Sequence, residues 1–237
     1  MKNKRNNSIA DHLIFWTVTY WLHIVLCVCI LFLRRIGYVN FLHRERASLG
    51  KGPLLIVANH PSLWEPWLMP GLFFPRSVLH PYRHIPWCTP DPHTYDRWYL
   101  FFLRPRSIPI PRDDKRGSVH AFHRMVDILQ GGERIVLFPE GGRTNRGDTF
   151  RTAPNNARIR EPKHGMAQMV LRTHATVLPI WVAGAERVLP VGALFPRFWH
   201  RTTMVVGKPI VWQPDDSDEK IHEQVIQTLL ALSCEVI

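Results

Sequence analysis

The chain has 237 residues, of which 46% are apolar and 21% charged. This balance excludes a disordered protein and allows one substantial hydrophobic core. The formal net charge is +11 and the pI about 10.0, which favours a polyanionic partner, either nucleic acid or an anionic membrane with phosphorylated lipid. The positive charge is scattered, and no zinc-finger, homeodomain-like or RNP1-like pattern occurs, so we expect no nucleic-acid partner.

The four cysteines predict no disulfide framework. They form no Cys-x-x-Cys pair, and two of them lie in a very apolar segment: Cys27, Cys29, Cys88 and Cys234. A domain in a reducing environment, facing the cytoplasm, fits this usage better than a secreted one.

Residues 13–33 form the longest apolar stretch. These 21 residues include no Lys, Arg, Asp or Glu, and as a helix they would cover roughly 30 Å, about the hydrocarbon thickness of a bilayer. A cleaved signal peptide is disfavoured, because Arg34 and Arg35 follow where small residues are needed. A helix that spans the membrane and one that lies in one leaflet both remain open, because aromatic residues cluster near one end and His23 stands in the middle.

Cations flank this segment unequally. Three precede it and five follow it: Lys2, Lys4 and Arg5, then Arg34, Arg35, Arg44, Arg46 and Lys51. If the segment spans, the excess places the rest of the chain on the cytoplasmic side. We therefore expect residues 1–40 to be an anchor in an anionic membrane and residues 41–237 to be one domain facing the cytoplasm.

Beyond residue 40 the sequence predicts alternating strands and helices. Short apolar runs predict buried strands at 53–58, 134–138 and 176–183, a strand around 202–211, and an edge strand with two prolines at 107–111. Helices are predicted at 116–130, at 165–174 and from near Asp216, where Glu219 would complete a capping box. The core-facing residues of the first and last helix should be Val119, Phe122, Met125, Val126 and Leu129, and Ile221, Val225, Leu229 and Leu232.

This alternation indicates the fold class. Strands that alternate with helices predict an α/β fold with a mixed central sheet flanked by helices. The apolar segment adds an N-terminal membrane-associated helix. The stretch 145–163 is long for a loop in a compact domain, and loops of that length are usually functional or mobile.

A histidine and a carboxylate follow the first predicted strand, as His60 and Glu65. Ligands bind at the ends of strands in α/β sheets. If the residues between them begin a helix, the carboxylate can reach one ring nitrogen, fix the tautomer and raise the basicity of the other nitrogen. We interpret His60 as a general base oriented by Glu65; a lone histidine is otherwise more often structural.

A second polar turn follows the strand at 134–138. Gly141 and Gly142 permit close approach of the backbone to a ligand, and Arg143 offers a planar fork for phosphate oxygens. An ordinary strand-ending turn with a surface arginine is the alternative. Between residues 141 and 165 there are six cations and two anions, which suits a solvated loop or a site that attracts a phosphorylated substrate and an anionic membrane. A base, an orienting acid and an arginine corner are what acyl transfer onto a phosphate-bearing alcohol requires.

Five blocks in order resemble the glycerolipid acyltransferases related to 1-acylglycerol-3-phosphate acyltransferase. Residues 59–65 (Asn-His-Pro-Ser-Leu-Trp-Glu) resemble that family's Asn-His-x-Ser-x-x-Asp block, and residues 138–144 (Phe-Pro-Glu-Gly-Gly-Arg-Thr) its Phe-Pro-Glu-Gly-Thr-Arg-Ser block. The family's block that ends in an arginine is similar to residues 107–112. Its apolar fourth block is similar to residues 177–180, and its terminal strand to residues 206–210. Each block alone is modest in specificity, but order and spacing agree over roughly residues 45–212.

The resemblance implies an acyltransferase without a metal or prosthetic group. His60 would deprotonate the hydroxyl of a lysophospholipid, most directly 1-acylglycerol-3-phosphate. The hydroxyl oxygen would then attack the thioester carbonyl of acyl-CoA or acyl carrier protein. Glu65 would orient His60, and Ser62 would be a local capping residue and not a nucleophile. The substrate site would consist of Arg112, Glu140, Gly141, Gly142 and Arg143.

Three departures from the family pattern leave the acceptor open. Glu65 is one methylene longer than the usual aspartate, Gly142 stands where threonine is common, and the loop 145–163 is longer than usual. An acyltransferase or tafazzin-like transacylase for a different lysolipid is one alternative, and a catalytically impaired lipid-binding relative is another.

Four side chains of metal-binding type come close together in the sequence: His80, His84, Cys88 and His93. Their spacing matches no familiar site, and the prolines among them break the regular structure that would align ligands. We therefore expect no metal there.

Overall fold

The computed structural model describes residues 9–47, 52–111, 113–144, 148–190, 192–193, 195–213 and 215–236. Its central sheet consists of β1 (Val39–Leu42), β2 (Leu54–Ala58), β3 (Arg134–Leu137), β6 (Thr176–Ala183) and β7 (Thr202–Val206). The strands lie in the order β1-β7-β6-β2-β3, and all neighbours are parallel except β6 and β7. The predicted α/β fold with a mixed sheet is confirmed.

The predicted buried strands lie where the apolar runs placed them. β2, β3 and β6 agree with the predictions to within one residue at each end, and all five residues of β2 are buried. A strand paired on both sides and covered on both faces needs this continuous apolar character. β7 is shorter than predicted, because it ends at Val206 and the chain returns to the sheet only through a single bridge between Ile210 and Val177.

The predicted edge strand at 107–111 is wrong. Ser107 makes one isolated bridge to Cys88, whose neighbour Trp87 makes another to Ile135 of β3. Residues 107–111 therefore lie at the expected edge of the sheet, beyond β3, but they form no strand of their own. Its prolines lack the N–H groups that a longer ladder would need.

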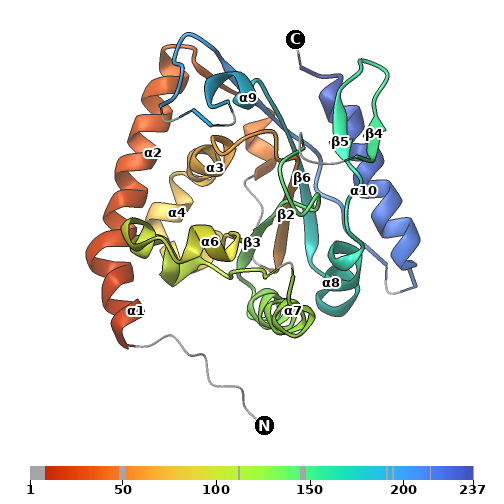
Figure 1. Cartoon of the computed structure of the whole chain (residues 1–237), viewed down its shortest axis with the longest axis horizontal. Helices are drawn as coiled ribbons and strands as arrows, with labels where there is room; N and C mark the ends of the chain where they lie inside the picture. The colour runs from red at the N-terminus through yellow and green to blue at the C-terminus, as the bar shows by residue number, and fades with distance from the viewer. Residues whose placement is uncertain are drawn as a thin grey trace.

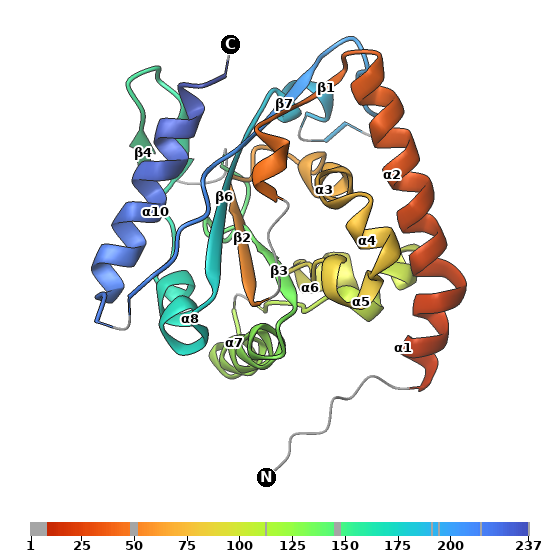
Figure 2. The ribbon, with the colours of Figure 1, turned by 180° about the vertical axis from the view of Figure 1, so that it is seen from behind.

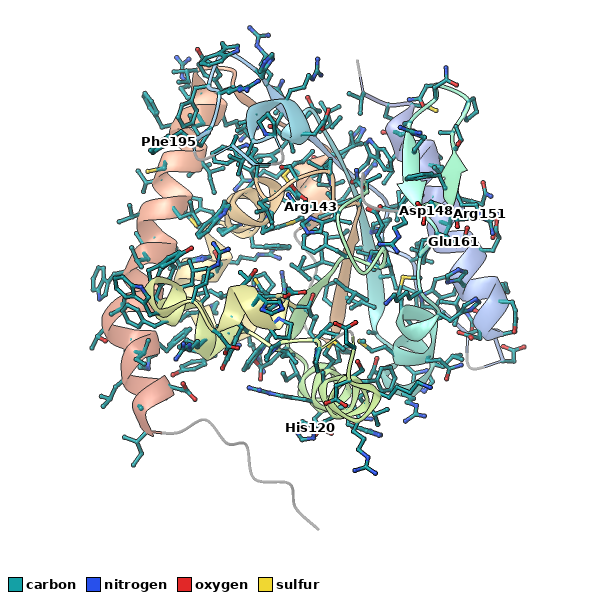
Figure 3. All side chains as sticks on the ribbon, in the orientation of Figure 1. His120, Arg143, Asp148, Arg151, Glu161 and Phe195 are labelled. Atoms are coloured by element: carbon teal, nitrogen blue, oxygen red, sulfur yellow. The ribbon has the colours of Figure 1, made fainter. Side chains whose placement is uncertain are left out.

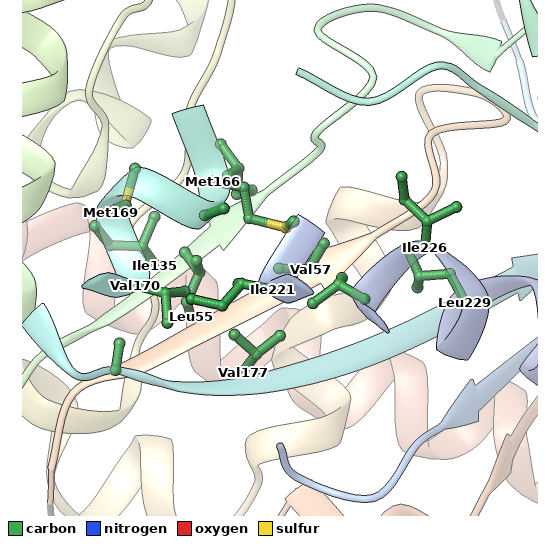
Figure 4. Close-up of a cluster of buried hydrophobic side chains, with 14 of the residues drawn as sticks. Leu55, Val57, Ile135, Met166, Met169, Val170, Val177, Ile221, Ile226 and Leu229 are labelled. Atoms are coloured by element: carbon green, nitrogen blue, oxygen red, sulfur yellow. The ribbon is translucent and has the colours of Figure 1, made fainter. Parts of the chain in front are cut away.

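Helices cover both faces of the sheet (Figures 1 and 2). The first face is covered by α2 (Tyr20–Arg35) and α3 (Glu65–Phe73), and the second by α7 (Lys115–Gln130), α8 (Gly165–Thr173) and α10 (Asp218–Ser233). The residues of β2 alternate between two cores: Leu54 and Ile56 pack with α3, whereas Leu55 and Val57 pack with the second group of helices (Figure 4). This alternation is the two-residue period of a strand.

The predicted helices exist, with two errors of detail. Val119 is 56% exposed; it stands six positions before Met125, so at about 100° per residue it points about 120° away from that side chain. In α10 the N-cap is Ser217, whose hydroxyl accepts from the N–H of Lys220, so no capping box with Glu219 forms. The four core-facing residues predicted for α10 are all buried.

Short elements fill the connections. The segment between α3 and α7 holds α4 (Arg76–Leu79), α5 (Pro81–His84), α6 (Pro92–Tyr95) and the 3-10 helix η3 (Trp98–Arg106). The 3-10 helix η2 (Arg44–Ala47) follows β1, and α9 (Ala185–Val188) follows β6. The predicted long loop contains a hairpin of β4 (Phe150–Thr152) and β5 (Arg158–Arg160).

The N-terminal segment is one continuous helix. α1 (Ile9–Ile14), the π-helical turn η1 (Phe15–Thr19) and α2 together cover Ile9–Arg35, which by length and composition alone could cross a membrane. One stripe is buried against the domain: Phe15, Thr19, His23, Cys27 and Ile30. The opposite stripe remains apolar and exposed, as at Trp21, Val25, Val28 and Phe32.

Candidate active site

Two polar loops meet at the carboxyl ends of β2 and β3. These strands are parallel neighbours, so the residues after Ala58 and those after Leu137 leave the sheet at the same edge. The N–H of His60 donates to Glu140 Oε1 at 2.6 Å, and the N–H of Thr144 donates to the carbonyl of His60 at 2.9 Å. The two predicted site segments, 59–65 and 138–144, are therefore joined directly. One hydrogen bond links backbone to side chain, and the other links backbone to backbone.

His60 and Glu65 are in contact through Nδ1 and Oε1. Glu65 is fully buried, whereas 13% of the His60 side chain is exposed. The ring of Phe138 stacks on the imidazole with centroids 4.3 Å apart. Because Glu65 engages Nδ1 and Phe138 covers one face, Nε2 is the nitrogen placed to exchange a proton with a substrate.

The sequence places the Glu65 carboxylate at the start of α3. Trp64 is the N-cap, so Glu65 lies in the first turn, where the positive end of the helix dipole stabilises a negative charge. Ser62 donates to both carboxylate oxygens, through its N–H to Oε1 at 3.2 Å and through its hydroxyl to Oε2 at 3.0 Å. The Ser62 hydroxyl also accepts from the N–H of Trp64 at 2.9 Å. This buried hydroxyl holds the Glu65 carboxylate in place, but Ser62 is not the cap of α3, whose N-cap is Trp64 with no side-chain cap bond.

Glu140 is a buried carboxylate that binds protein groups. Burial raises its pKa above the usual value, and hydrogen bonds from the backbone of His60 and of Arg160 and from the hydroxyl of Thr144 act in the opposite direction. The bonds from Arg160 and Thr144 both measure 2.9 Å. Glu140 has no exposed surface, and it fixes the backbone of His60 and the turn that follows Glu140 itself. Direct contact of Glu140 with a substrate stays a prediction.

The glycine turn has a specific backbone requirement. Gly141 has φ +63°, and a Cβ there would lie 2.8 Å from Cε of Lys163. The N–H of Lys163 donates to the carbonyl of Pro139 at 2.9 Å, so the lysine backbone is fixed beside the turn. Gly142 is buried, and Arg143 is half-buried near the centre of the view, between α3 and the hairpin (Figure 3). Arg112 lies outside the described residues.

Sequence reasoning missed several residues that build the site. Asn59 pairs with the backbone of Val182, accepting at 2.7 Å and donating at 2.9 Å, and so joins the His60 loop to β6. Thr144 and Lys163 contact the turn around Gly141. Asn59 and Thr144 belong to two blocks of the family resemblance, and that membership could have identified them. Nothing in the sequence distinguishes Lys163 from the other five cations between residues 141 and 165.

The described residues include no group of three or more His, Cys, Asp or Glu side chains placed to hold a metal ion. Among the four side chains considered from the sequence, burial raises the pKa of Cys88 to about 11.

Comparison with known proteins defines the class to which this fold and site belong. The model of the Acyltransferase family matches residues 38–183, more than half of the chain and including both loops of the site, and the protein belongs to that family. This confirms the resemblance drawn from the five blocks.

Two curated plant proteins are similar to this chain. The chloroplastic 1-acyl-sn-glycerol-3-phosphate acyltransferase LPAT1 of Arabidopsis thaliana is 26% identical over 103 residues, which cover 44% of this chain and 26% of that protein. The chloroplastic 1-acyl-sn-glycerol-3-phosphate acyltransferase BAT2 of Brassica napus is 27% identical over 123 residues, 50% of this chain and 33% of that protein. The matched region thus spans a third or less of these relatives.

A solved structure shares the fold. The crystal structure of the 1-acyl-sn-glycerophosphate (LPA) acyltransferase PlsC from Thermotoga maritima superposes with a TM-score of 0.68 at 17% sequence identity. The superposition covers 92% of this chain and 79% of that chain.

Proposed function

We propose that this protein transfers a fatty acyl group from acyl-CoA or acyl carrier protein to the free hydroxyl of a lysophospholipid, with 1-acylglycerol-3-phosphate as the first candidate acceptor. The observation that carries the proposal is the contact of the His60 imidazole with the buried Glu65 carboxylate, at strand ends beside the Arg143 turn. Membership of the Acyltransferase family supports the reaction class. The names of the two plant relatives and of the structural neighbour support the acceptor.

The reaction needs one base and one proton donor. Nε2 of His60 takes the proton of the acceptor hydroxyl while its oxygen attacks the thioester carbonyl carbon. The tetrahedral intermediate then expels the thiolate, the carbon–sulfur bond breaks, and the imidazolium returns the proton to the leaving sulfur. Glu65 stabilises the imidazolium through Nδ1, which is the usual contribution of a carboxylate paired with a catalytic histidine.

The acceptor headgroup is assigned to the glycine turn. Arg143 supplies a planar guanidinium suited to two phosphate oxygens, and the backbone at Gly141 and Gly142 allows close approach. Arg112 is proposed to complete this site, as the resemblance implies. The donor thioester enters as a co-substrate, with no cofactor.

The N-terminal helix is proposed to lie in the plane of one leaflet. Its buried stripe packs on the domain, and His23 Nε2 lies 2.9 Å from the hydroxyl of Ser77 at α4, so the polar ring of His23 has a partner within the protein and not in lipid. If the helix spanned the bilayer and kept its contacts, α3 and α4 would lie in the hydrocarbon with it. If it spanned the bilayer alone, His23 would lose its Ser77 partner. The exposed apolar stripe suits contact with acyl chains. We further propose that the domain faces the cytoplasm and an anionic leaflet.

The structure bears on the alternatives. The Glu65–His60 contact is made despite the longer side chain, which favours an active enzyme over a lipid-binding relative that has lost its base. Gly142 in place of threonine changes the turn proposed to bind the headgroup, which keeps a different lysolipid acceptor, or a transacylase reaction, as the second candidate.

The proposal is tested by thiol release from acyl-CoA in the presence of purified protein and lysophosphatidate. We expect thiol release that depends on the acceptor, together with formation of the diacyl product by lipid mass spectrometry. Arg143→Ala should impair transfer to phosphorylated acceptors more than slow hydrolysis of the thioester. Equal loss in both assays would show that Arg143 is structural, and absence of any diacyl product from a panel of lysolipids would contradict the function.

A further inference from the structure

The segment 195–201 exposes three large aromatic side chains in sequence. Phe195 is 79% exposed, Phe198 47% and Trp199 73%. Single exposed apolar residues are ordinary, but a cluster of large ones usually marks a surface that contacts a partner or a membrane. We call residues 195–201 the aromatic loop.

The backbone of the aromatic loop is fixed to the domain. The N–H of Arg197 donates to the carbonyl of the buried residue Val188 at 2.7 Å, and the N–H of His200 donates to the carbonyl of Arg197 at 3.1 Å. The rings of Phe198 and Trp64 meet edge to face, with centroids 6.1 Å apart. The aromatic side chains therefore point outward from an anchored turn.

Within residues 187–201, the Asp, Glu, Lys and Arg positions are occupied by arginine alone. From Arg187 to Arg201 the sequence contains three arginines and no Asp or Glu, and Arg197 and Arg201 are exposed. Aromatic rings with interspersed cations are the composition of the membrane interface, where rings occupy the headgroup level and cations bind anionic lipid.

The aromatic loop ends beside the segment that follows the N-terminal helix. Directly after the loop, the N–H of Thr202 donates to the carbonyl of Tyr38 at 3.0 Å, three residues beyond the last residue of α2. Phe32 and Ile36 at this end of the helix are 61% and 46% exposed. Figure 3 shows Phe195 beside α2 in projection, in agreement with this connection.

We propose that the aromatic loop is a membrane-contact site of its own, in which Phe195, Phe198 and Trp199 enter the headgroup–acyl boundary of an anionic bilayer next to the exposed stripe of α2. This inference rests on the proposed in-plane placement of that helix and adds a second contact to it. Phe198 contacts Trp64, the N-cap of α3, and Glu65 is the next residue. The loop therefore lies next to the turn that carries Glu65, so its contact with lipid would set the active site close to the bilayer.

The test uses a polarity-sensitive fluorophore on single cysteines of the full chain. Cys29 on α2 and Cys234 are exposed, whereas Cys27 is buried and Cys88 half-buried. In a C29S/C234S background, Trp199→Cys reports on the aromatic loop and Val211→Cys on a control position. Val211 is 73% exposed and follows Ile210, which bridges Val177 near the start of β6, the opposite end of that strand from the aromatic loop. Native Cys29, kept in a C234S variant, reports on the helix. Vesicles of phosphatidylglycerol and phosphatidylcholine carry spin-labelled acyl chains as quenchers.

We expect a blue shift and strong quenching at position 199, comparable with those at Cys29, and little change at position 211. Quenching at Cys29 with none at position 199 would overturn the aromatic-loop contact and leave the in-plane helix standing. Equal quenching at positions 199 and 211 would overturn it as well, because the contact would not be specific. Phe195→Cys provides a second position that must agree with position 199. Because none of these signals depends on catalysis, they test the contact separately from the acyltransferase activity.

Discussion

The backbone N–H of His60 donates to the side chain of Glu140, although 80 positions separate the two residues in the chain. Together with the contact between its ring and Glu65, this bond fixes the proposed base at both its backbone and its side chain. Loss of either carboxylate should therefore affect the proposed base, but in different ways. Loss of Glu140 should lower the stability of the fold, and loss of Glu65 should slow proton transfer.

Glu140→Gln should destabilise the fold. Glutamine has one acceptor oxygen, so its amide N–H₂ would face a backbone N–H of His60 or of Arg160 in place of a carboxylate oxygen. A buried donor left unpaired costs about 1–3 kcal/mol of unfolding free energy. Chemical denaturation in detergent micelles measures this. Glu223→Gln is the control, because Glu223 is 47% exposed and pairs with Arg151 at the surface, where ion pairs contribute about 0–1 kcal/mol. Equal effects of the two variants would contradict the assigned role.

Glu65→Gln should reduce kcat with little change in stability. The glutamine side chain can still accept from Ser62, but it cannot balance the charge of the imidazolium that forms when His60 takes a proton. We expect a loss on the order of 10²-fold, the lower end of the effect of a general base. Steady-state rates with saturating acyl donor measure it, and Glu219→Gln on the exposed first turn of α10 is the control. A variant that retains the wild-type rate would show that Glu65 does not assist the base.

Gly141→Ala should lose both stability and activity. The left-handed conformation at φ +63° costs a residue with a Cβ about 1–2 kcal/mol, and the new Cβ would displace Lys163. Gly132→Ala is a matched control, because Gly132 has φ +75° and nothing within 4 Å of the added atom. Both variants should unfold more easily, but only Gly141→Ala should also lower the transfer rate of the folded enzyme. Equal rates in the two folded variants would mean that Lys163 and the turn can shift without consequence.

The stability of the protein should fall on mild acidification, in part through His84. Burial lowers the pKa of His84 from 6.5 to about 4, and Arg134, His80, Arg76 and Arg83 add to the effect. The unfolded chain binds a proton at His84 more readily than the folded chain does. The contribution of His84 to the free energy of unfolding is therefore fully present above pH 6.5 and is lost as the pH falls towards 4. Unfolding free energies measured at several pH values should therefore decrease less steeply for His84→Gln than for the wild type. Parallel pH dependences would exclude His84 as a contributor.

The core and the strand ends were predictable because their signals are local. Continuous apolar runs predicted β2, β3 and β6, and the polar segments that follow two of these runs contain the candidate residues His60 and Arg143. The parallel register of β2 and β3 then brings the two loops together. A single sequence indicates that both loops leave a sheet, but not that the strands are neighbours.

The parts that failed depend on tertiary contacts or on close competitors. The hairpin of β4 and β5 has three residues in each strand and mostly polar side chains, too short a pattern to separate from a loop. Ser217 and Asp216 both suit an N-cap, and only the geometry selects Ser217. The bond between His60 and Glu140 joins residues 80 positions apart, so no local pattern could reveal that this carboxylate binds the backbone of the proposed base.

The most direct test of the account is the rate of acyl transfer by His60→Ala, measured with acyl-CoA and the acceptor that the wild-type enzyme uses best. We expect kcat/KM to fall by about 10²–10⁴-fold, while the unfolding transition and the binding to anionic vesicles stay close to those of the wild type. A folded His60→Ala protein that transfers acyl groups at the wild-type rate would contradict the assignment of His60 as the base, and with it the proposed mechanism.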